Sequence, residues 1–414
     1  MNLLSTSLLS AVAVGVKAVC LLATNKILAI YVGPSGYALI GQFQNALTAA
    51  ITVASAGVTT GVTKFTAEYD ADSPRQQAMW ATAGFIGVIG ATTIAAALVI
   101  FREPIAAGLL RDRSYADLVL WSAFCLPLAV LNALLLAVLN GKKAIRAFVA
   151  ANIANSLVSL AVVGGLATWL GLRGALIALA LGQAMSCLLT LWLCARQPWF
   201  KLGALLGRPD HRAVNGLLQF TVMAAATSVL GPLSQMLARD GLIDRVGGVP
   251  AGHWEALMRL SSLYLMFVTT PLSVYYLPRL AELTDKVALR REVREGYQLL
   301  LPVAAGLALV IFLLRDWIVT LLFTHEFAPM RELFLWQMVG DVLRVAAWLL
   351  SFYLLGKAMT KPFLAAEVTF SLSFVFLVDL FTSSLGIGGA PIAYAVNNAL
   401  YLGFLAAIVR RDLV

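Results

Sequence analysis

The residues that are the clearest candidates for a chemical role are charged side chains inside otherwise apolar stretches. The stretch "WQMVGDVLRVAAW", from Trp336 to Trp348, carries Asp341 and Arg344 three residues apart, close enough on one face of a helix to pair. A charge inside a membrane is costly, so it needs either a partner or a water-filled surrounding. The spacing therefore predicts a structural ion pair or a pair that lines a pathway, and both interpretations stay open here.

Three further basic residues lie inside apolar stretches. Lys17 and Lys26 have no acidic neighbour in their own stretch, whereas Arg259 follows Glu255 by four residues and can pair with it. Lys17 lies near the middle of its stretch, so we expect its side chain to face a cavity. Lys26 comes nine residues later and would point the opposite way on a straight helix.

Acidic residues in apolar stretches are candidates for carrying a proton or another cation. Glu367 and Asp379 lie together in one stretch. Each is either half of an ion pair with a neighbouring helix or a cation site created by desolvation of the carboxyl group. With Asp341 they form the predicted set of coupling residues.

Catalytic motifs are absent from the sequence. The three histidines are isolated, and no nucleotide-binding loop or hydrolase motif occurs. The four cysteines lie in apolar stretches without the paired spacing of a disulfide framework or a zinc site. We therefore expect no enzymatic activity, no cofactor and no metal.

The composition is that of a membrane protein. Of 414 residues, 60% are hydrophobic and 12% are charged, against about 45–50% and about 25% in soluble domains. Apolar stretches of roughly 20 residues recur, each long enough to cross a ~30 Å hydrocarbon core as a helix. The predicted fold is an all-α integral membrane protein with twelve transmembrane helices and no strands. The predicted spans are 7–31, 38–63, 78–101, 115–140, 145–170, 172–195, 214–238, 254–277, 296–323, 329–356, 362–385 and 388–409.

The distribution of basic residues predicts the orientation. With the N-terminus in the cytoplasm, eighteen of the 30 Lys and Arg residues fall on the cytoplasmic side, while eight, including Arg239 and Arg245, fall in loops on the other side. This bias predicts that both termini are cytoplasmic. We expect no nucleic-acid partner despite the net charge of +9, because no aromatic-basic groove pattern accompanies the basic residues. The first stretch lacks a basic leader, so we expect a retained helix with no soluble domain on either side.

The two halves of the chain repeat one another. "LVLW" ending at Trp121 matches "LFLW" ending at Trp336, and "LGLRGALIA" from Leu170 matches "LGIGGAPIA" from Leu385, both with an offset of 215 residues. Because each copy contains an even number of helices, six, the second copy enters the membrane in the same orientation as the first. We expect a six-helix lobe at 1–197, a cytoplasmic linker at 198–212 and a second six-helix lobe at 213–414, an arrangement typical of alternating-access transporters.

Three motifs resemble the Wzx family of bacterial polysaccharide flippases. They are "GVTKFTAEYD" from Gly61, "LPRLAELTDK" from Leu277 and "WQMVGDVLRV" from Trp336. The resemblance runs over essentially the whole chain and implies membership of the multidrug/oligosaccharidyl-lipid/polysaccharide exporter superfamily, with a V-shaped cavity that opens alternately to each side. The implied substrate is an undecaprenyl-diphosphate-linked oligosaccharide, such as an O-antigen or enterobacterial common antigen unit. It would be moved from the cytoplasmic to the periplasmic leaflet of the inner membrane.

The resemblance also assigns roles to residues. Lys17, Lys26 and Arg259 are expected to hold the diphosphate by similarity with related lipid-precursor flippases, and Arg344 is a further candidate because cations bind phosphate through charge-assisted hydrogen bonds. Polar side chains expected on the cavity wall for the sugar are Asn25, Gln42, Asn45 and Gln235. Coupling would use the membrane potential alone or proton antiport through Asp341, Glu367 or Asp379.

Three alternative functions make different demands on the sequence. A drug/cation antiporter of the same superfamily would prefer an acidic or aromatic cavity, which the four buried cations disfavour. A membrane enzyme would need a large catalytic loop, and the loops here are short. A non-transporting membrane partner of the polymerisation machinery is the remaining alternative. Expected partners are the lipid-linked oligosaccharide and the bilayer, with a polysaccharide polymerase and a chain-length regulator as further candidates, and we expect a monomer.

Overall fold

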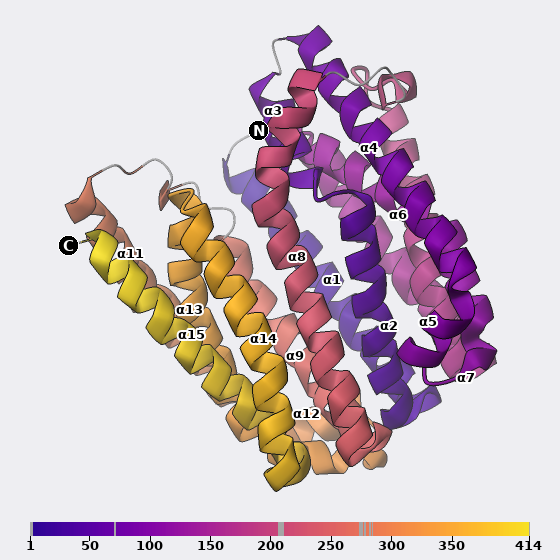
Figure 1. Ribbon diagram of the computed structural model, residues 1–414, viewed down its shortest axis with the longest axis vertical. Coiled ribbons are helices and arrows are strands. Elements are labelled where there is room, and N and C mark those ends of the chain that lie inside the picture. Colours follow the sequence, from indigo (N-terminus) through magenta and orange to yellow (C-terminus); the bar gives the residue numbers. More distant parts are fainter. Residues whose placement is uncertain are drawn as a thin grey trace. The chain divides into compact units, whose positions relative to one another are not determined.

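A computed structural model describes residues 3–69, 72–205, 211–272, 276, 279–280, 283 and 285–413. This part of the chain consists of helices joined by short turns and contains no strand (Figure 1). The prediction of an all-α protein is confirmed for these residues. The chain forms two compact units. One comprises residues 1–32 and 39–233, and the other comprises residues 33–38 and 234–414.

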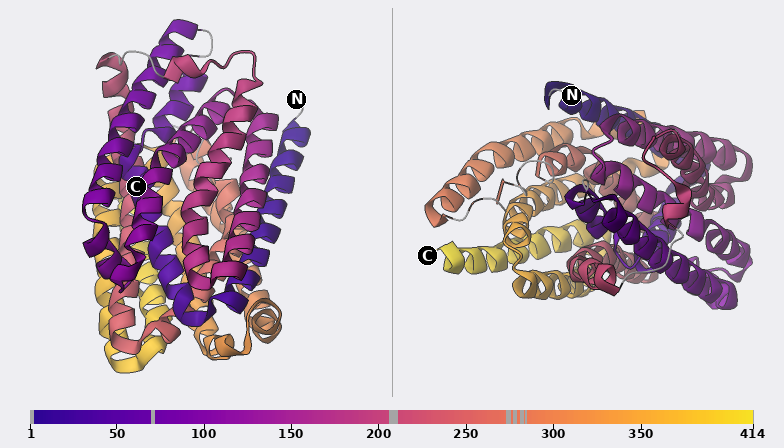
Figure 2. Two further views of the ribbon diagram at one scale, coloured as in Figure 1. Left: turned by 90° about the vertical axis from the view of Figure 1, so that its right-hand side faces the viewer. Right: turned by 90° about the horizontal axis from the view of Figure 1, so that it is seen from above.

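The first unit contains long helices that run side by side (Figure 2). Its elements are α1 (Leu3–Tyr31), most of α2 (Gly33–Ala54), α3 (Thr59–Glu68), α4 (Ser73–Ile100), α5 (Arg102–Leu109), η1 (Arg113–Tyr115), α6 (Ala116–Gly141), α7 (Ile145–Ala195), η2 (Leu202–Leu205) and the first part of α8 (His211–Val246). Helix α7 packs against both α1 and α6. The core lies around Trp80, Leu126 and Leu135, and the Trp80 indole donates a hydrogen bond of 2.8 Å to Thr66.

The second unit is built mainly from α9, α11, α13, α14 and α15. Its elements after α8 are α9 (Gly248–Pro271), α11 (Lys286–Leu313), α12 (Arg315–Leu322), η4 (His325–Leu333), α13 (Phe334–Gly356), α14 (Thr360–Leu385), η5 (Gly386–Gly388) and α15 (Gly389–Leu413). Helix α13 contacts α9, α11 and α15. It is therefore the helix through which the others are joined.

Many of the helices are apolar enough for a bilayer. Seven described helices qualify by length and composition, and the bent pair α2 and α3 would add an eighth. Two of the seven are 51 and 54 residues long, more than twice what a ~30 Å core requires at ~1.5 Å per residue. The multi-pass character is confirmed, whereas twelve spans in two six-helix lobes stay a prediction.

The local backbone repeats with the offset found in the sequence. Lys143 and Ala358 both have a φ of 52°, and Gly171 and Gly386 have φ values of 55° and 60°. The predicted break at residue 171 is confirmed, because Gly171 interrupts α7 with a non-helical conformation. Gly386 ends α14 in the same way. Each long apolar segment thus turns at an equivalent glycine.

The seventh predicted span differs from the structure at its end. The seventh span was expected to end at residue 238 and to leave Arg239 and Arg245 in a loop, but α8 continues to Val246. That prediction is wrong because the polar residues at the end of α8 stay helical, and the Arg239 side chain is only 3% exposed. The predicted end of the eighth span at 277 and part of the predicted linker, 206–210, lie outside the described residues.

Candidate functional site

A polar cavity of about 380 Å³ lies within the first unit. Helices α1, α2, α6 and α7 supply its walls. Its polar lining residues are Lys17, Thr24, Gln44, Thr48, Asn132, Asn152, Asn155, Ser156, Ser159, Gln183 and Ser186. Hydroxyl and amide groups of this kind can donate and accept hydrogen bonds to a polar ligand.

Helical spacing explains how these side chains reach one cavity. Residues three, four or seven apart share a helix face. On α1, Thr24 follows Lys17 by seven residues, and on α7 Asn152, Ser156 and Ser159 follow one another at such intervals. Each wall is thus a polar stripe on an otherwise apolar helix.

The charge of the cavity is positive. Lys17 is the one charged side chain in its described lining, which contains no carboxylate. An anion is therefore attracted to this cavity, and a cation is repelled. Its electrostatics favour a phosphate-bearing ligand over a cationic drug.

Two amide oxygens on this wall have no hydrogen-bond partner among the described residues. The Oδ1 atoms of Asn132 and Asn155 are buried and lack a hydrogen bond within the described structure. Asn132 is 4% exposed. Buried polar atoms are normally paired, so an unpaired acceptor on a cavity wall suits a ligand that donates from hydroxyl groups. Sugars carry many such donors.

The predicted sugar-binding residues do not line this cavity. Asn25 and Gln42 are buried away from the cavity lining, and neither Asn45 nor Lys26 lines it. Their sequence neighbours Thr24 and Gln44 line the cavity instead. The missed signal was periodicity, since stepping along α1 from Lys17 in helical turns reaches Thr24 and bypasses Asn25. Gln235 lies half-buried on α8 in the second unit.

A buried carboxylate organises the second unit. Asp341 on α13 is 1% exposed and accepts hydrogen bonds from Ser261 (2.6 Å), Tyr264 (2.6 Å) and Tyr394 (2.9 Å). Ser261 and Tyr264 come from one turn of α9, and Tyr394 comes from α15. These hydroxyl donors satisfy the carboxylate while joining three helices.

Arg344 reaches the same cluster without touching Asp341. Its Nη1 donates to the Tyr394 hydroxyl at 3.2 Å, and its guanidinium lies 4.6 Å from the centre of the Trp348 ring. No direct hydrogen bond or ion pair joins Asp341 and Arg344 among the described residues. The two charges are linked through the tyrosine.

The other two predicted coupling residues have different surroundings. Glu367 on α14 accepts a 2.7 Å hydrogen bond from Tyr401 on α15 and is half-buried. Asp379 forms a 2.6 Å ion pair with Arg245, with side chains 52% and 40% exposed respectively. Of these two acids, Glu367 lies in the better position to exchange a proton inside the protein.

Arg259 lies in a triad of charges. The Glu255 carboxylate pairs with Arg259 at 2.8 Å and also with Arg239. The Arg259 guanidinium lies 5.7 Å from the centre of the Tyr37 ring. Arg239 was not predicted as an internal charge, and spacing could not reveal it, because its partner follows 16 residues later on another helix. Within the described residues, no cluster of His, Cys, Asp or Glu could hold a metal ion.

Comparison with known proteins identifies a family model and two relatives that match this chain. A family model described as "Polysaccharide biosynthesis protein" matches residues 3–284. The lipid III flippase of Escherichia coli (strain K12) is 32% identical over 415 residues, which cover 99% of this chain and 98% of that protein. The lipid III flippase of Shigella flexneri matches to the same extent.

Solved structures share the fold. An inward-facing multidrug resistance MATE family transporter of the MOP superfamily has a TM-score of 0.80 at 14% identity, covering 96% of this chain and 94% of that one. The lipid II flippase MurJ in an inward closed conformation has a TM-score of 0.75 at 14% identity, covering 97% and 88%. At these identities the likeness shows the fold alone.

Proposed function

The chain belongs to the polysaccharide biosynthesis protein family, as a Wzx-type member of the MOP superfamily, and from this premise we propose that it flips a lipid-linked oligosaccharide across the membrane. The predicted family is thereby confirmed. The relatives are flippases and transporters, in agreement with a protein that is not an enzyme.

The observation that carries the proposal is the position of Lys17. It is the cation of a cavity whose other described polar lining is made of amides and hydroxyls. A phosphate group binds the Lys17 ammonium, because charge-assisted hydrogen bonds are the strongest that such a site offers. The sugar hydroxyl groups bind the amide side chains, above all the unpaired oxygens of Asn132 and Asn155, to which they donate hydrogen bonds. A lipid-linked glycan supplies both groups.

The finer features of the proposal come from the family resemblance. The carrier is undecaprenyl diphosphate, the glycan is an O-antigen or enterobacterial common antigen unit, and movement runs from the cytoplasmic to the periplasmic leaflet of the inner membrane. The name of the 32%-identical relatives, lipid III flippase, supports a lipid-linked substrate.

The remaining predicted cations are secondary candidates for the headgroup. Arg259 pairs with Glu255 and Arg344 donates to Tyr394, so part of each guanidinium is already occupied, whereas Lys17 lines the polar cavity itself. Lys26 does not line the described cavity. We therefore place Lys17 first in the order of headgroup contacts.

Coupling has two candidate sources. Moving one negative charge outward across an inside-negative membrane releases about 2.3 kcal/mol per 100 mV, so the potential alone could drive an anionic headgroup. Proton antiport would use Asp341 or Glu367, whose hydroxyl partners Tyr394 and Tyr401 both lie on α15. An imposed potential and an imposed pH gradient separate these schemes when each is applied alone.

The test is flipping in liposomes. The purified protein would be reconstituted with a fluorescent undecaprenyl-diphosphate glycan, and the protected fraction would be followed in wild type, Lys17→Ala and Lys17→Arg. We expect Lys17→Ala to slow flipping by about tenfold or more, the cost of one lost charged contact, and Lys17→Arg to keep most of the rate. Lys201→Ala, at an exposed position, is the control for loss of a positive charge.

Equal flipping by Lys17→Ala and wild type would remove Lys17 from the substrate pathway. The drug antiporter is tested in the same vesicles with a cationic dye. Dye transport without glycan flipping would replace the present proposal. Neither activity in a folded protein would favour a non-transporting role.

A further inference from the structure

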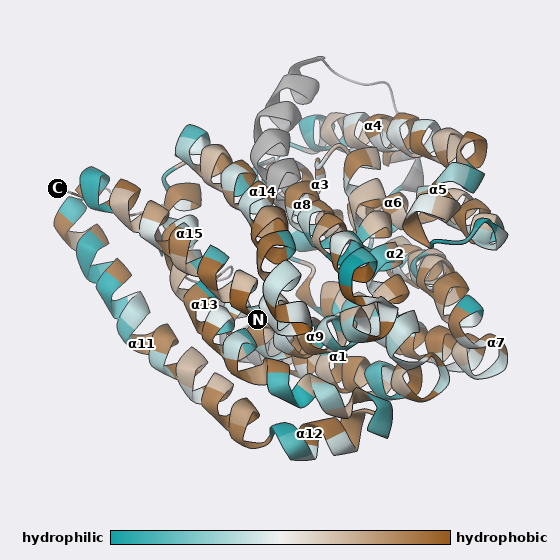
Figure 3. Cartoon of the chain, turned by 60° about the horizontal axis from the view of Figure 1, so that its bottom comes forward, coloured by the Kyte–Doolittle hydropathy of each residue, from teal (hydrophilic) through white to brown (hydrophobic). Residues whose placement is uncertain are grey.

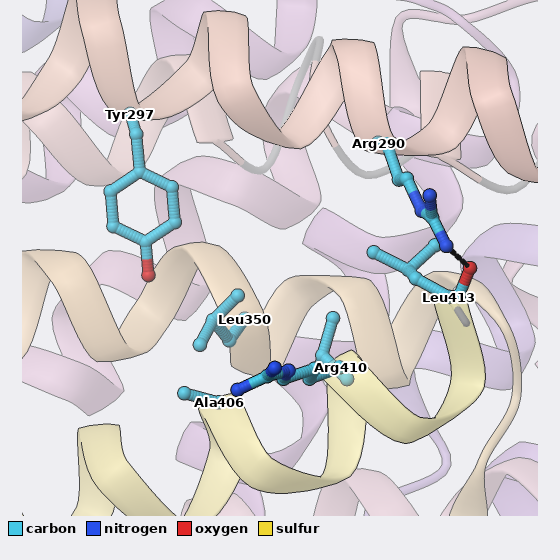
Figure 4. Close-up of a pocket in the computed structure, with 7 residues that line it drawn as sticks. Arg290, Tyr297, Leu350, Ala406, Arg410 and Leu413 are labelled. Carbon is cyan, nitrogen blue, oxygen red and sulfur yellow. Dashed lines mark hydrogen bonds between the residues drawn. The ribbon is translucent and has the colours of Figure 1, made fainter.

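An open pocket of about 500 Å³ lies in the second unit and is called the second cavity below. It is lined by Arg290 and Tyr297 of α11, Leu350 of α13, and Ala406, Val409, Arg410 and Leu413 of α15. Figure 4 shows Arg290 of α11 extending toward Leu413 and Arg410 of α15 extending toward Ala406, and both residues line the pocket. The cavity thus combines two cationic groups with an apolar wall.

The two arginines differ in how they are held. Arg290 donates a hydrogen bond to the backbone carbonyl of Leu413, near the end of α15 (Figure 4). Arg410 forms no hydrogen bond or ion pair within the described part of the chain. The described lining of the pocket contains no carboxylate, so Arg290 and Arg410 are its charged residues.

The surroundings place this cavity at the boundary between lipid and water. The first turns of α11 are hydrophilic and the rest of the helix is hydrophobic (Figure 3). The last turn of α15 carries Arg410 and Arg411. Both ends lie among the residues predicted to face the cytoplasm. Basic pockets between helices at that interface suit anionic lipid headgroups.

We propose that this cavity binds the phosphate of an anionic phospholipid of the bilayer. Arg290 and Arg410 contact the phosphate oxygens, for which the planar guanidinium is well shaped. The acyl chain lies along Tyr297, Leu350 and Val409, which form an apolar continuation of the same cavity. The occupant is a resident lipid rather than the transported one, so the inference stands or falls separately from Lys17.

Native mass spectrometry provides the test. The full-length protein in detergent would be titrated with phosphatidylglycerol or phosphatidylcholine, and the bound fraction would be followed for each lipid. We expect wild type to retain phosphatidylglycerol about tenfold more tightly than phosphatidylcholine. Arg290→Ala/Arg410→Ala should lose that preference and keep its weak binding of phosphatidylcholine.

The matched control is Arg291→Ala/Arg411→Ala, which removes the same charge from adjacent positions that do not line the cavity. It should bind phosphatidylglycerol as wild type does. Because Arg290 also holds the end of α15, Arg410→Ala alone is measured in parallel and leaves that hydrogen bond in place. Thermal unfolding confirms that each variant is folded.

Three results would overturn the proposal. One is a preference for phosphatidylglycerol that stays unchanged both in folded Arg410→Ala and in folded Arg290→Ala/Arg410→Ala. Another is the same loss in the control pair, which would indicate a diffuse surface charge. The third is tighter binding of undecaprenyl phosphate than of phosphatidylglycerol at these arginines, which would make the cavity an entry point for the transported carrier.

Discussion

Asp341 and Arg344 lie one helical turn apart on α13 and are connected through the hydroxyl of Tyr394, which donates to the carboxylate and accepts from the guanidinium. The tyrosine lies 53 residues from Asp341 in sequence. It thus ties α15 to both charges of α13. A buried charge without a partner is costly, so this hydroxyl supports two groups at once.

Replacing Tyr394 by phenylalanine should destabilise the protein. The change removes one of the hydroxyl donors to Asp341 and the acceptor of Arg344, and a hydrogen bond to a charged group contributes about 1.5–3 kcal/mol. Thermal unfolding in detergent measures the effect. Tyr297→Phe is the control, because that hydroxyl donates to the uncharged carbonyl of Ala346 at 2.7 Å and should contribute about 1 kcal/mol. Equal losses in the two variants would contradict a special role for the bridge.

The glycine beside Asp341 makes room for this tyrosine. A Cβ at Gly340 would lie 2.3 Å from Cδ1 of the Tyr394 ring and 3.3 Å from the Cα of Ala395. Gly340→Ala should therefore push α15 away from α13 and cost about 1–3 kcal/mol, as overpacking does. Gly403→Ala on α15 is the control, since nothing lies within 4 Å of its added methyl group. A Gly340→Ala protein with the melting temperature of wild type would show that α13 and α15 can move apart without loss of stability.

Matching residues recur at one offset in the sequence, and the backbone at Lys143 and Ala358 follows the same offset. The sequence also indicated the partnership of Arg259 with Glu255, since both lie on one helix. The link through Tyr394 could not be predicted, because the partner comes from another helix. Helical spacing reports contacts within a helix and is silent on contacts between helices.

The candidate site was predicted in part for the same reason. Lys17 stood out as a basic residue near the middle of an apolar stretch without an acidic neighbour, and the structure places it on the polar cavity. The polar cavity residues of α6 and α7, such as Asn132 and Asn152, were not identified, because a single amide in an apolar helix does not indicate which neighbour it faces. Arg239 was assigned to a loop, since the polar end of α8 resembles one in sequence.

The equivalent glycines at 171 and 386 should resist substitution. Both have positive φ with ψ values of −134° and −143°, a region essentially restricted to glycine. Alanine at either position should cost about 1–3 kcal/mol in thermal unfolding. Gly165→Ala is the control, because it lies inside α7 without a positive φ and with open space around its Cβ. If Gly171→Ala and Gly165→Ala unfold alike, the turn does not depend on glycine.

Removing the central carboxylate of the charge triad should be more damaging than removing an exposed one. Glu255→Gln removes the carboxylate charge that pairs with both Arg239 and Arg259, and breaking a buried pair costs about 3–5 kcal/mol. The matched change is Asp117→Asn, which breaks the half-exposed pair with Arg173 and should cost about 1 kcal/mol or less. Yield of folded protein and melting temperature would be measured for both. Similar values would mean that the triad is hydrated and contributes little.

A negative charge on the wall of the polar cavity should oppose transport of an anionic headgroup. Asn155→Asp introduces a carboxylate into a described lining that has Lys17 as its one charge. Asn155→Ala removes the unpaired amide oxygen and no hydrogen bond within the described structure, so its stability should stay near that of wild type. We expect flipping to fall about tenfold in Asn155→Ala, the value of one hydrogen bond to a sugar hydroxyl, and further in Asn155→Asp through repulsion of the phosphates. The liposome assay ranks the three proteins directly, and an aspartate variant that flips faster than the alanine variant would point to a substrate without an anionic headgroup.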